Sequence, residues 1–324
     1  MTATSGGPAA DFVPGEAAGP PLKLGIVVPC YNAETWIRRA LASLLDAAPA
    51  DAVTVVVDDG STDGSAAAVE GFGRGVILER QANAGACRAR NRGMEIAADR
   101  GATHVIFFDA DDYVEGPMLT GAMAVAARTH ADLILCEMTE ETEDGRHTVS
   151  MWQGEVAPEA FFHGWWTGGY LNPSAVVWKI ALVRAVGGWD ESLAQAQDLD
   201  ITLRAMFLRP LIVKNDEGLA VQHRVNPASI TKTVSRATIE SRLRVLEDLL
   251  DRARGTPFEA SKPEMLPKVY TMARRAFQNG QPDLGRRAMA RLRREGGWRH
   301  HGTAAHVWAS RVLGLERKVR LWGN

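Results

Sequence analysis

The chain has 324 residues, of which 46% are hydrophobic and 23% are charged. This composition is typical of a folded globular protein and argues against an intrinsically disordered chain. The formal net charge of -2 gives no indication that nucleic acid is the main partner. Cys30, Cys87 and Cys136 form neither a CxxC pair nor a disulfide-like spacing. Their isolation favours a reducing cytoplasm.

The charge is distributed unevenly along the chain. Residues 235–324 contain 19 Lys or Arg and 9 Asp or Glu, a net of +10, so the remainder carries -12. Such a basic tail either packs against the acidic body or contacts an anionic surface. No apolar run approaches the roughly 20 residues that a membrane span needs. We therefore expect a cytoplasmic protein, with peripheral contact of the basic tail with the inner face of the membrane as a further expectation.

Apolar runs and helical spacings divide the chain into three parts. The first 20 residues are rich in Ala, Gly and Pro, and they predict a disordered leader rather than a signal peptide. From residue 22 onward, β-rich runs at 24–28, 53–57, 76–78 and 104–108 alternate with segments of helical periodicity. This alternation predicts an α/β fold with a mostly parallel sheet and helices on both faces. Residues 235–324 predict a helical C-terminal extension.

Polar residues follow three of these runs. The sequence PCYN begins at Pro29, the pair Asp58-Asp59 follows the second run, and DADD follows the fourth run at 109–112. In open parallel sheets, ligands bind beyond the carboxyl ends of the strands. These polar groups are therefore predicted to meet at one edge of the sheet.

The acidic segment 109–112 places three carboxylates within four residues. Carboxylates this close repel one another, and the cost calls for a cation or for protonation. Hard cations such as Mg²⁺ take oxygen ligands and often share them with substrate phosphates. Asp109 and Asp111 are thus candidates for a metal that binds a diphosphate. Taken alone, the segment is equally compatible with a solvated loop or a helix cap.

Two further candidates come from the neighbouring motifs. Asp58 or Asp59 can accept a hydrogen bond from a base or a ribose hydroxyl, although Asp-Gly-Ser sequences also favour turns. The helix predicted over 86–98 carries three arginines near its start. Arg88 and Arg92 lie one turn apart and suit a solvated face. Arg90 points elsewhere, and we expect it to make an inward contact with a phosphate.

Together these pieces resemble the inverting glycosyltransferases of family 2, which have the GT-A fold. The motifs occur in order as VVPCYNAE at 27–34, VDDGSTD at 57–63, NAGACRARNRG at 83–93 and FDADD at 108–112. The resemblance covers about residues 24–231. It implies a GT-A type, Rossmann-like domain over 22–234, followed by the basic helical region 235–324.

The resemblance implies a donor site. Pro29, Tyr31 and Glu34 would line the pocket for the nucleotide base and ribose, and the pair Asp58-Asp59 would contact the base. Arg90 would remain the phosphate contact.

The resemblance also implies a metal site in the acidic segment. Asp109 and Asp111 would form the DxD motif of the family, with Asp112 beside them as a further ligand. The metal would be Mg²⁺ or Mn²⁺, bridging the donor diphosphate.

The catalytic base is implied further along the chain. The family usually has a Glu-Asp pair opening a helix that ends in Leu-Arg, and here Gln197 replaces the Glu while Asp198 matches the Asp. The resemblance therefore implies that Asp198 removes a proton from the acceptor hydroxyl. From the residues alone, Asp198 is an ordinary helix N-cap.

Two other segments carry candidate contacts. The sequence HRVNPAS at 223–229 resembles a family segment that closes over the diphosphate, which implies that Arg224 contacts a phosphate. Asn226 stands where the family often has a histidine, so whether His223 contacts the metal stays open. Trp165, Trp166 and Asn172 are candidates for an acceptor platform, with a place in the buried core as the alternative.

The sequence thus predicts a metal-dependent, inverting transfer of a sugar from a nucleotide-sugar, with a UDP-sugar as the expected donor. The acceptor would be a hydroxyl of a glycan or glycolipid in cell-surface polysaccharide biosynthesis. A nucleotidyltransferase would show a Gly-rich phosphate loop where this chain has PCYNAE, and an NAD-linked oxidoreductase would show GxGxxG there. A non-catalytic nucleotide-sugar or glycan-binding module stays open because of Gln197.

Overall fold

A computed structural model describes residues 12–15, 21–149, 156–169, 171–224, 234–296 and 314–322. The chain divides into two compact units. The first comprises Met1–Pro158, Tyr170–Glu191 and Arg204–Pro227, and the second comprises Glu159–Gly169, Ser192–Leu203 and Ala228–Asn324. Two stretches from within 22–234 therefore group with the C-terminal helices. Of the predicted leader, the structure describes residues 12–15, where Gly15 N donates to Asp132 Oδ2 at 2.8 Å.

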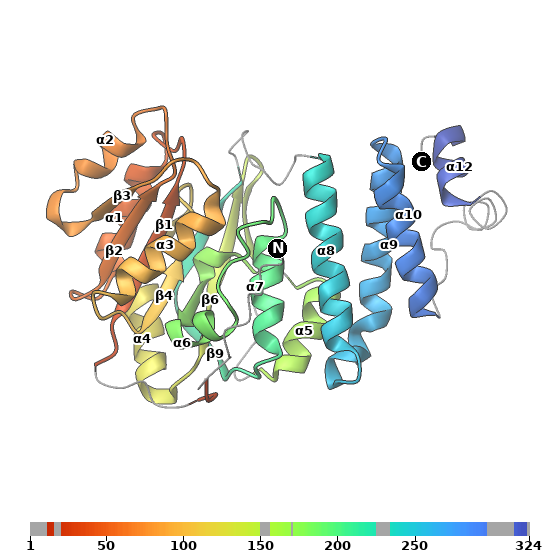
Figure 1. The fold of residues 1–324 in the computed structure, drawn as a ribbon. Coiled ribbons are helices and arrows are strands. Elements are labelled where there is room, and N and C mark those ends of the chain that lie inside the picture. The colour runs from red at the N-terminus through yellow and green to blue at the C-terminus, as the bar shows by residue number, and fades with distance from the viewer. Residues whose placement is uncertain are drawn as a thin grey trace, which may run out of the picture. The chain divides into compact units, whose positions relative to one another are not determined.

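The first unit contains a sheet in the order β3-β2-β1-β4-β8-β6-β9-β5, with β7 paired to β6. Figure 1 labels β1, β2, β3, β4, β6 and β9 of this sheet. Parallel pairs join β1 to β2 and β4, β2 to β3, and β6 to β9, whereas the other pairs are antiparallel. The strands are β1 (Leu24–Cys30), β2 (Val53–Asp58), β3 (Ile77–Arg80), β4 (His104–Phe107), β5 (Tyr113–Glu115), β6 (Leu133–Thr142), β7 (Gly145–Val149), β8 (Val176–Lys179) and β9 (Ile212–His223). The predicted α/β fold is confirmed, with β3, β2, β1 and β4 as a wholly parallel part of the sheet and the antiparallel pairs from β8 onward in the strand order.

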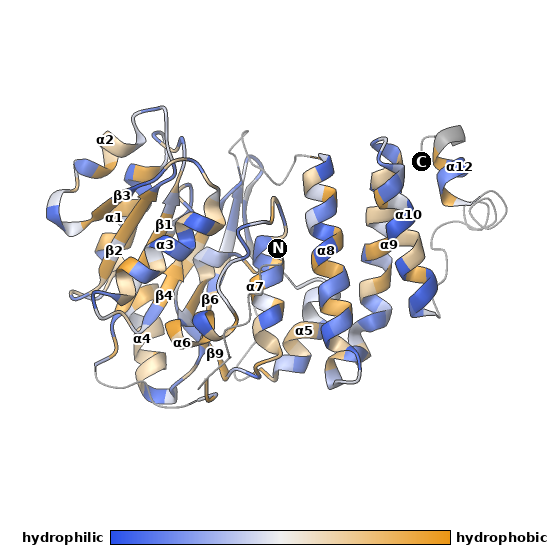
Figure 2. Cartoon of the chain, in the orientation of Figure 1, coloured by the Kyte–Doolittle hydropathy of each residue, from blue (hydrophilic) through white to orange (hydrophobic). Residues whose placement is uncertain are grey.

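Helices cover both faces of β1 and β2, which explains why both strands are almost wholly buried and coloured as apolar (Figure 2). Ile26 and its same-face neighbours share one apolar core cluster with α1 and α4. Val27 faces α3 on the other side, because a Cβ built on Gly93 would meet it. The helices of this unit are α1 (Ile37–Ala47), α2 (Ser65–Glu70), α3 (Ala86–Ala98), α4 (Met118–Thr129) and α6 (Ile180–Ala185), with 3-10 helices η1 (Gly73–Gly75) and η2 (Pro173–Ala175).

The second unit is helical, as predicted for its C-terminal part. It contains α5 (Pro158–Trp166), α8 (Arg236–Ala253), η4 (Pro257–Ser261), α9 (Lys262–Gln278), α10 (Pro282–Glu295), α12 (Leu315–Trp322) and the start of α7 (Gln197–Met206). α9 packs against α8, α10 and α12. Ion pairs join these helices to one another, such as Arg287 on α10 with Glu247 on α8. Among the described helices, none has the length and hydrophobicity of a membrane span.

The polar strand ends meet as predicted. Cys30, the last residue of β1, is in register with Asp58, the last residue of β2. The backbone N–H of Asp59 then donates to Cys30 O at 2.8 Å, and that of Phe108 donates to Val27 O at 2.8 Å. The segments that follow β1, β2 and β4 therefore leave the sheet at the same edge.

Gly93 permits the close approach of α3 to the sheet, and this makes a testable prediction. A Cβ at this position would collide with Val27 and would lie 3.2 Å from Val57 Cγ2. We expect Gly93→Ala to lower the free energy of unfolding by about 1–3 kcal/mol in a urea titration, because overpacking displaces helix or strand. Gly75→Ala is the control, since nothing lies within 4 Å of its added Cβ. Equal stabilities of the two variants would contradict this account of the packing.

Candidate functional site

The loops after β1 and β2 are tied to each other. Asn32 Oδ1 accepts from the backbone N–H of Thr62 at 2.8 Å, and Glu34 Oε2 accepts from that of Gly64 at 3.0 Å. Tyr31, directly before Asn32, is 52% exposed. Of the residues expected to line the base pocket, Glu34 thus engages the neighbouring loop while Tyr31 faces outward from the sheet edge.

The two aspartates after β2 are both buried. Asp58 closes the turn that follows the strand, since its Oδ1 accepts from a backbone N–H three residues on. Asp59 accepts three hydrogen bonds, from Gln81 Nε2 at 2.7 Å and from the backbone N–H groups of Ala84 at 2.9 Å and Gly85 at 2.8 Å. Asp59 therefore fixes the loop that leads into α3, a role that the predicted contact with a base did not include.

Arg90 on α3 reaches the first aspartate of the acidic segment. Its Nη2 lies 2.7 Å from Asp109 Oδ1, and its guanidinium carbon lies 4.5 Å from the centre of the Trp189 ring. The side chain of Arg90 is 6% exposed and that of Asp109 is 30% exposed. Arg90 points inward, as predicted, and its buried guanidinium offsets the negative charge of the acidic segment. Contact between Arg90 and a phosphate stays a prediction.

Asp112 is turned into the protein and is 2% exposed. Its Oδ2 accepts from Ser174 Oγ at 2.7 Å and from Asn172 Nδ2 at 3.1 Å, and its Oδ1 accepts from the His223 backbone N–H at 3.0 Å. Burial, together with the charges of the two other aspartates of the segment, raises the pKa of Asp112 well above its ordinary value. Both oxygens of this predicted metal ligand are thus engaged by the chain's own donors.

The three predicted acceptor residues lie in different surroundings. Asn172 is 1% exposed, and its Oδ1 also accepts from the backbone N–H of Ser174 at 2.7 Å, so its amide supports the buried Asp112. Trp165 and Trp166 lie on α5 of the second unit. Trp166 is buried with its ring centre 5.9 Å from that of Phe162, which agrees with the core alternative. Trp165 is half-buried.

Asp109 and Asp111 are the aspartates of the segment that stay partly exposed. Carboxylate oxygens are suitable ligands for Mg²⁺ or Mn²⁺, and two of them leave positions for phosphate oxygens and water. Within the part of the chain that the structure describes, three or more His, Cys, Asp or Glu side chains do not gather in an arrangement suited to a metal ion. The two partly exposed carboxylates of Asp109 and Asp111 fit a cation that would complete its coordination with substrate oxygens.

Asp198 lies in the first turn of α7, within the second unit. Gln197, in the place of the usual Glu, donates from Nε2 to Leu193 O at 2.9 Å. This amide therefore holds the approach to the helix, and Asp198 is the carboxylate that remains at the position of the expected acidic pair.

The residues at the end of β9 meet acidic partners on β6. Arg224 Nη2 lies 2.7 Å from Glu140 Oε1, so the expected phosphate contact is an ion pair in this structure. His223 Nδ1 lies 3.0 Å from Glu141 Oε2, and its ring packs against Trp36. Asn226 lies outside the described residues.

Two further residues, which the sequence analysis did not single out, hold the segments near the carboxyl ends of the strands. Ser174 Oγ accepts from the backbone N–H of Asp109 at 3.0 Å besides bonding Asp112, so one hydroxyl joins both ends of the acidic segment. Asn91 bonds both the backbone N–H and the carbonyl of Trp189 at 2.9 Å. The motif at 83–93 did contain a sign that Asn91 makes a contact, because this polar residue follows Arg90 directly in the sequence. No local pattern pointed to Ser174.

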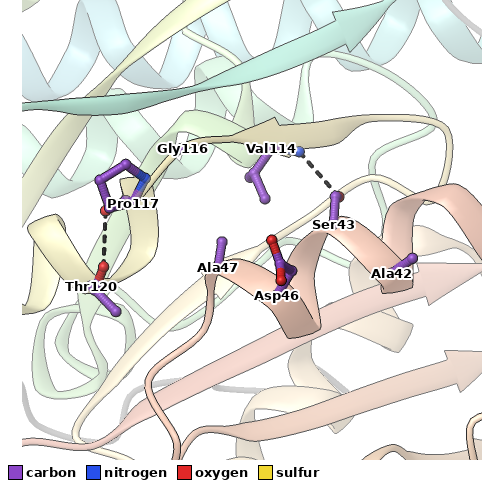
Figure 3. Close-up of a pocket in the computed structure, with 8 residues that line it drawn as sticks. All are labelled: Ala42, Ser43, Asp46, Ala47, Val114, Gly116, Pro117 and Thr120. Carbon is purple, nitrogen blue, oxygen red and sulfur yellow. Dashed lines mark hydrogen bonds between the residues drawn. The ribbon is translucent and has the colours of Figure 1, made fainter.

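A separate hollow lies between α1 and the start of α4 (Figure 3). Its volume is about 670 Å³. Two hydroxyls in its wall serve the fold, since Ser43 Oγ accepts from Val114 N at 3.2 Å and Thr120 Oγ1 donates to Pro117 O at 3.1 Å. It is lined by Ala42, Ser43, Asp46, Ala47, Val114, Gly116, Pro117 and Thr120. None of the candidate site residues lines this hollow.

Residues 25–176 match the profile of Glycosyl transferase family 2. The chain carries a family 2 glycosyltransferase domain. It is 27% identical over 237 residues to the uncharacterized glycosyltransferase EpsJ of Bacillus subtilis. The aligned region covers 68% of this chain and 66% of that protein. The chain is 36% identical over 117 residues to the uncharacterized glycosyltransferase YibD of Escherichia coli, covering 35% of this chain and 33% of that relative. The chain therefore spans two thirds or less of these relatives' lengths.

Two solved structures resemble the fold of this chain over most of its length. Staphylococcus aureus TarS 1–349 in complex with UDP-GlcNAc gives a TM-score of 0.59 at 18% identity, covering 87% of this chain and 95% of that one. GalNAc-T7 with UDP, GalNAc and Mn²⁺ gives 0.54 at 14% identity, covering 70% and 48%. These likenesses show the fold, and they confirm the predicted GT-A type architecture.

The pairing of Arg90 with Asp109 makes a prediction about stability. Arg90→Met leaves Asp109 without its cation beside two other carboxylates, so we expect the free energy of unfolding in urea to fall by about 2 kcal/mol. Arg92→Met, two residues along the same helix, removes an exposed pair with Glu79 and should change it by less than about 1 kcal/mol. A variant of Arg90 as stable as that of Arg92 would contradict the role assigned to the buried guanidinium.

Proposed function

We propose that this chain transfers a sugar from a nucleotide-sugar, with a UDP-sugar as the preferred donor, to a hydroxyl of a glycan or lipid-linked glycan. One observation carries the proposal. In a family 2 domain, the partly exposed pair Asp109 and Asp111 stands at the carboxyl end of β4, where ligands of such sheets bind, and Arg90 holds Asp109 in place.

The names of similar proteins support a place in cell-surface polysaccharide biosynthesis. Over 144 residues the chain is 32% identical to a poly(ribitol-phosphate) beta-N-acetylglucosaminyltransferase, TarS of Staphylococcus aureus, covering 24% of it. Over 100 residues it is 39% identical to the succinoglycan biosynthesis protein ExoU of Rhizobium meliloti, covering 28% of it. One name specifies a poly(ribitol-phosphate) acceptor and the other the biosynthesis of succinoglycan, so both concern the synthesis of a polymer. The acceptor of this chain is proposed at that level of detail, as a growing glycan with a free hydroxyl.

Donor binding is assigned to the edge of the sheet. UDP and UDP-GlcNAc appear in the solved structures with which the chain shares its fold, which supports a UDP-sugar. The exposed ring of Tyr31 and the buried Asp58 are proposed to hold the base and ribose, while Asp59 keeps the 81–85 loop in place. Asp109 and Asp111 would hold Mg²⁺ or Mn²⁺, which when bound neutralises charge on the departing diphosphate. GalNAc-T7 was solved with Mn²⁺.

Asp198 is proposed as the general base. Its carboxylate takes the proton of the acceptor hydroxyl while that oxygen forms a bond to the anomeric carbon. The bond from the anomeric carbon to the diphosphate oxygen breaks in the same displacement, and the nucleoside diphosphate leaves with both electrons. A single displacement inverts the anomeric centre. Gln197 does not titrate, so this assignment leaves the proton to Asp198.

A non-catalytic module that binds a nucleotide-sugar or glycan is the second candidate, because Gln197 departs from the usual acidic pair. The same donor site would serve it, so turnover separates the two functions. The expected cytoplasmic location and the peripheral contact of the basic tail with a membrane stay predictions.

Nucleotide release from a panel of UDP-, GDP- and other nucleotide-sugars tests the donor proposal. With Mn²⁺ and a mixture of glycan acceptors, we expect release from a UDP-sugar, and EDTA should abolish it. Asp111→Asn should lower release by about 100-fold or more, because it removes charge from the site of the diphosphate. Asp51→Asn, at an exposed turn, is the matched control. Release that persists in EDTA would contradict the metal requirement.

The role of Asp198 has a test of its own. We expect Asp198→Asn to lose turnover by about 100-fold or more while the affinity for UDP stays unchanged, because the base acts on the acceptor. NMR of the product should show the anomeric configuration opposite to that of the donor. A product of retained configuration would exclude a single displacement. Wild-type binding of a nucleotide-sugar with no turnover of any acceptor would favour the binding module.

A further inference from the structure

Arg39 on α1 contacts the acidic segment, although it lies 72 positions before Asp111 in the sequence. Its Nη2 donates to the backbone carbonyl of Asp111 at 3.1 Å. Its guanidinium carbon lies 4.3 Å from the centre of the Tyr113 ring and 5.8 Å from that of Trp36. One planar cation therefore stacks on the first residue of β5 and holds the backbone of the second DxD aspartate.

Glu141 on β6 contacts Arg39 and three of the polar side chains near it. Its Oε1 accepts from Tyr113 Oη at 3.1 Å, and its Oε2 lies 3.0 Å from His223 Nδ1 and 3.8 Å from Arg39 Nη1. Arg146 Nε lies 3.5 Å from Oε1. Burial by itself would raise the pKa of Glu141, but the hydrogen bonds from His223 and Tyr113 and the charge of Arg146 lower it below its ordinary value.

The same carboxylate reaches the acidic segment by a second route. His223, held by Glu141 through its ring, donates its backbone N–H to Asp112 Oδ1 at 3.0 Å. Glu141 therefore sits behind two separate contacts, one through Arg39 to the backbone of Asp111 and one through His223 to the side chain of Asp112. These two contacts hold consecutive residues of the segment.

We propose that Arg39 and Glu141 are positioning residues that hold the backbone of Asp111 in the orientation needed to bind the donor diphosphate. This role rests on the proposed function, because it matters only where the Asp111 carboxylate serves a donor. Groups behind metal-binding carboxylates fix their direction, and misplacement of such a group weakens binding without unfolding the protein. Arg39 also brings positive charge to a segment with three carboxylates, while Glu141 keeps its guanidinium in place.

Calorimetric titration of UDP into the full chain with Mn²⁺ tests the proposal. We expect Arg39→Gln to raise the Kd of UDP about tenfold, or about 1.4 kcal/mol, because the bond to Asp111 is lost. Arg38→Gln is the matched control, since Arg38 is the preceding residue of α1 and is exposed. It should bind as the wild type does. Thermal melts followed by circular dichroism show whether either variant is unfolded at the titration temperature.

A second variant keeps the test valid if Arg39→Gln is unstable. Glu141→Gln has nearly the same shape and retains an acceptor for Tyr113, yet it loses the charge that holds Arg39, and we expect a similar weakening. In the double variant the two losses should add only in part, because both act on the contact to Asp111 while Glu141 also holds His223. Arg39→Lys should recover part of the affinity, since it keeps the charge without the planar stack.

The outcomes separate the two proposals. Wild-type protein that binds UDP, together with Arg39→Gln and Glu141→Gln of unchanged Kd, would overturn the positioning role alone. Losses that add in full in the double variant would also overturn it, because independent effects would then explain them. Wild-type protein that binds no nucleotide with Mn²⁺ would overturn the proposed function, and the positioning role with it.

Discussion

Electrostatic repulsion within the acidic segment 109–112 is the constraint on which the rest of this site depends. Three carboxylates in four residues do not remain charged side by side without compensation. The three aspartates have different partners and different degrees of burial. Asp109 pairs with the buried guanidinium of Arg90, Asp112 is buried with three hydrogen-bond donors and a raised pKa, and Asp111 stays partly exposed with its carbonyl bonded to Arg39. The segment therefore presents two aspartates outward and uses the third as an anchor.

This division depends on the architecture of the sheet. β1, β2 and β4 are buried on both faces and end at one edge, so the loops that follow them are brought together by strand pairing and not by their own sequence. The loops after β1 and β2 bond one another through Asn32 and Glu34, and Asp59 bonds the loop that follows β3. A rigid edge of this kind suits a ligand whose base, ribose and diphosphate must be held at fixed spacings.

The sequence predicted β1 to β4 and a parallel sheet built on them, because apolar runs and helical spacings are local signals, whereas β5 to β9 and their antiparallel pairs were not among the predicted runs. It also placed the motifs at the strand ends and indicated that Arg90 points inward. The roles of Asp112 and Asn172 were not predictable, because a DADD motif carries no sign of which aspartate is buried. Arg39 and Ser174 were missed for a related reason. They meet the acidic segment through contacts 72 and 65 positions apart in sequence, and no periodicity records such pairings.

We propose that a metal-bridged nucleoside diphosphate binds at the carboxyl end of β4. Anomalous diffraction at the manganese edge, from crystals grown with UDP and Mn²⁺, tests it directly. We predict one manganese peak within coordination distance of carboxylate oxygens of Asp109 or Asp111 and of the diphosphate, with Asp112 still bonded to Ser174. A UDP molecule bound away from this edge, or bound here with manganese held by neither aspartate, would contradict it.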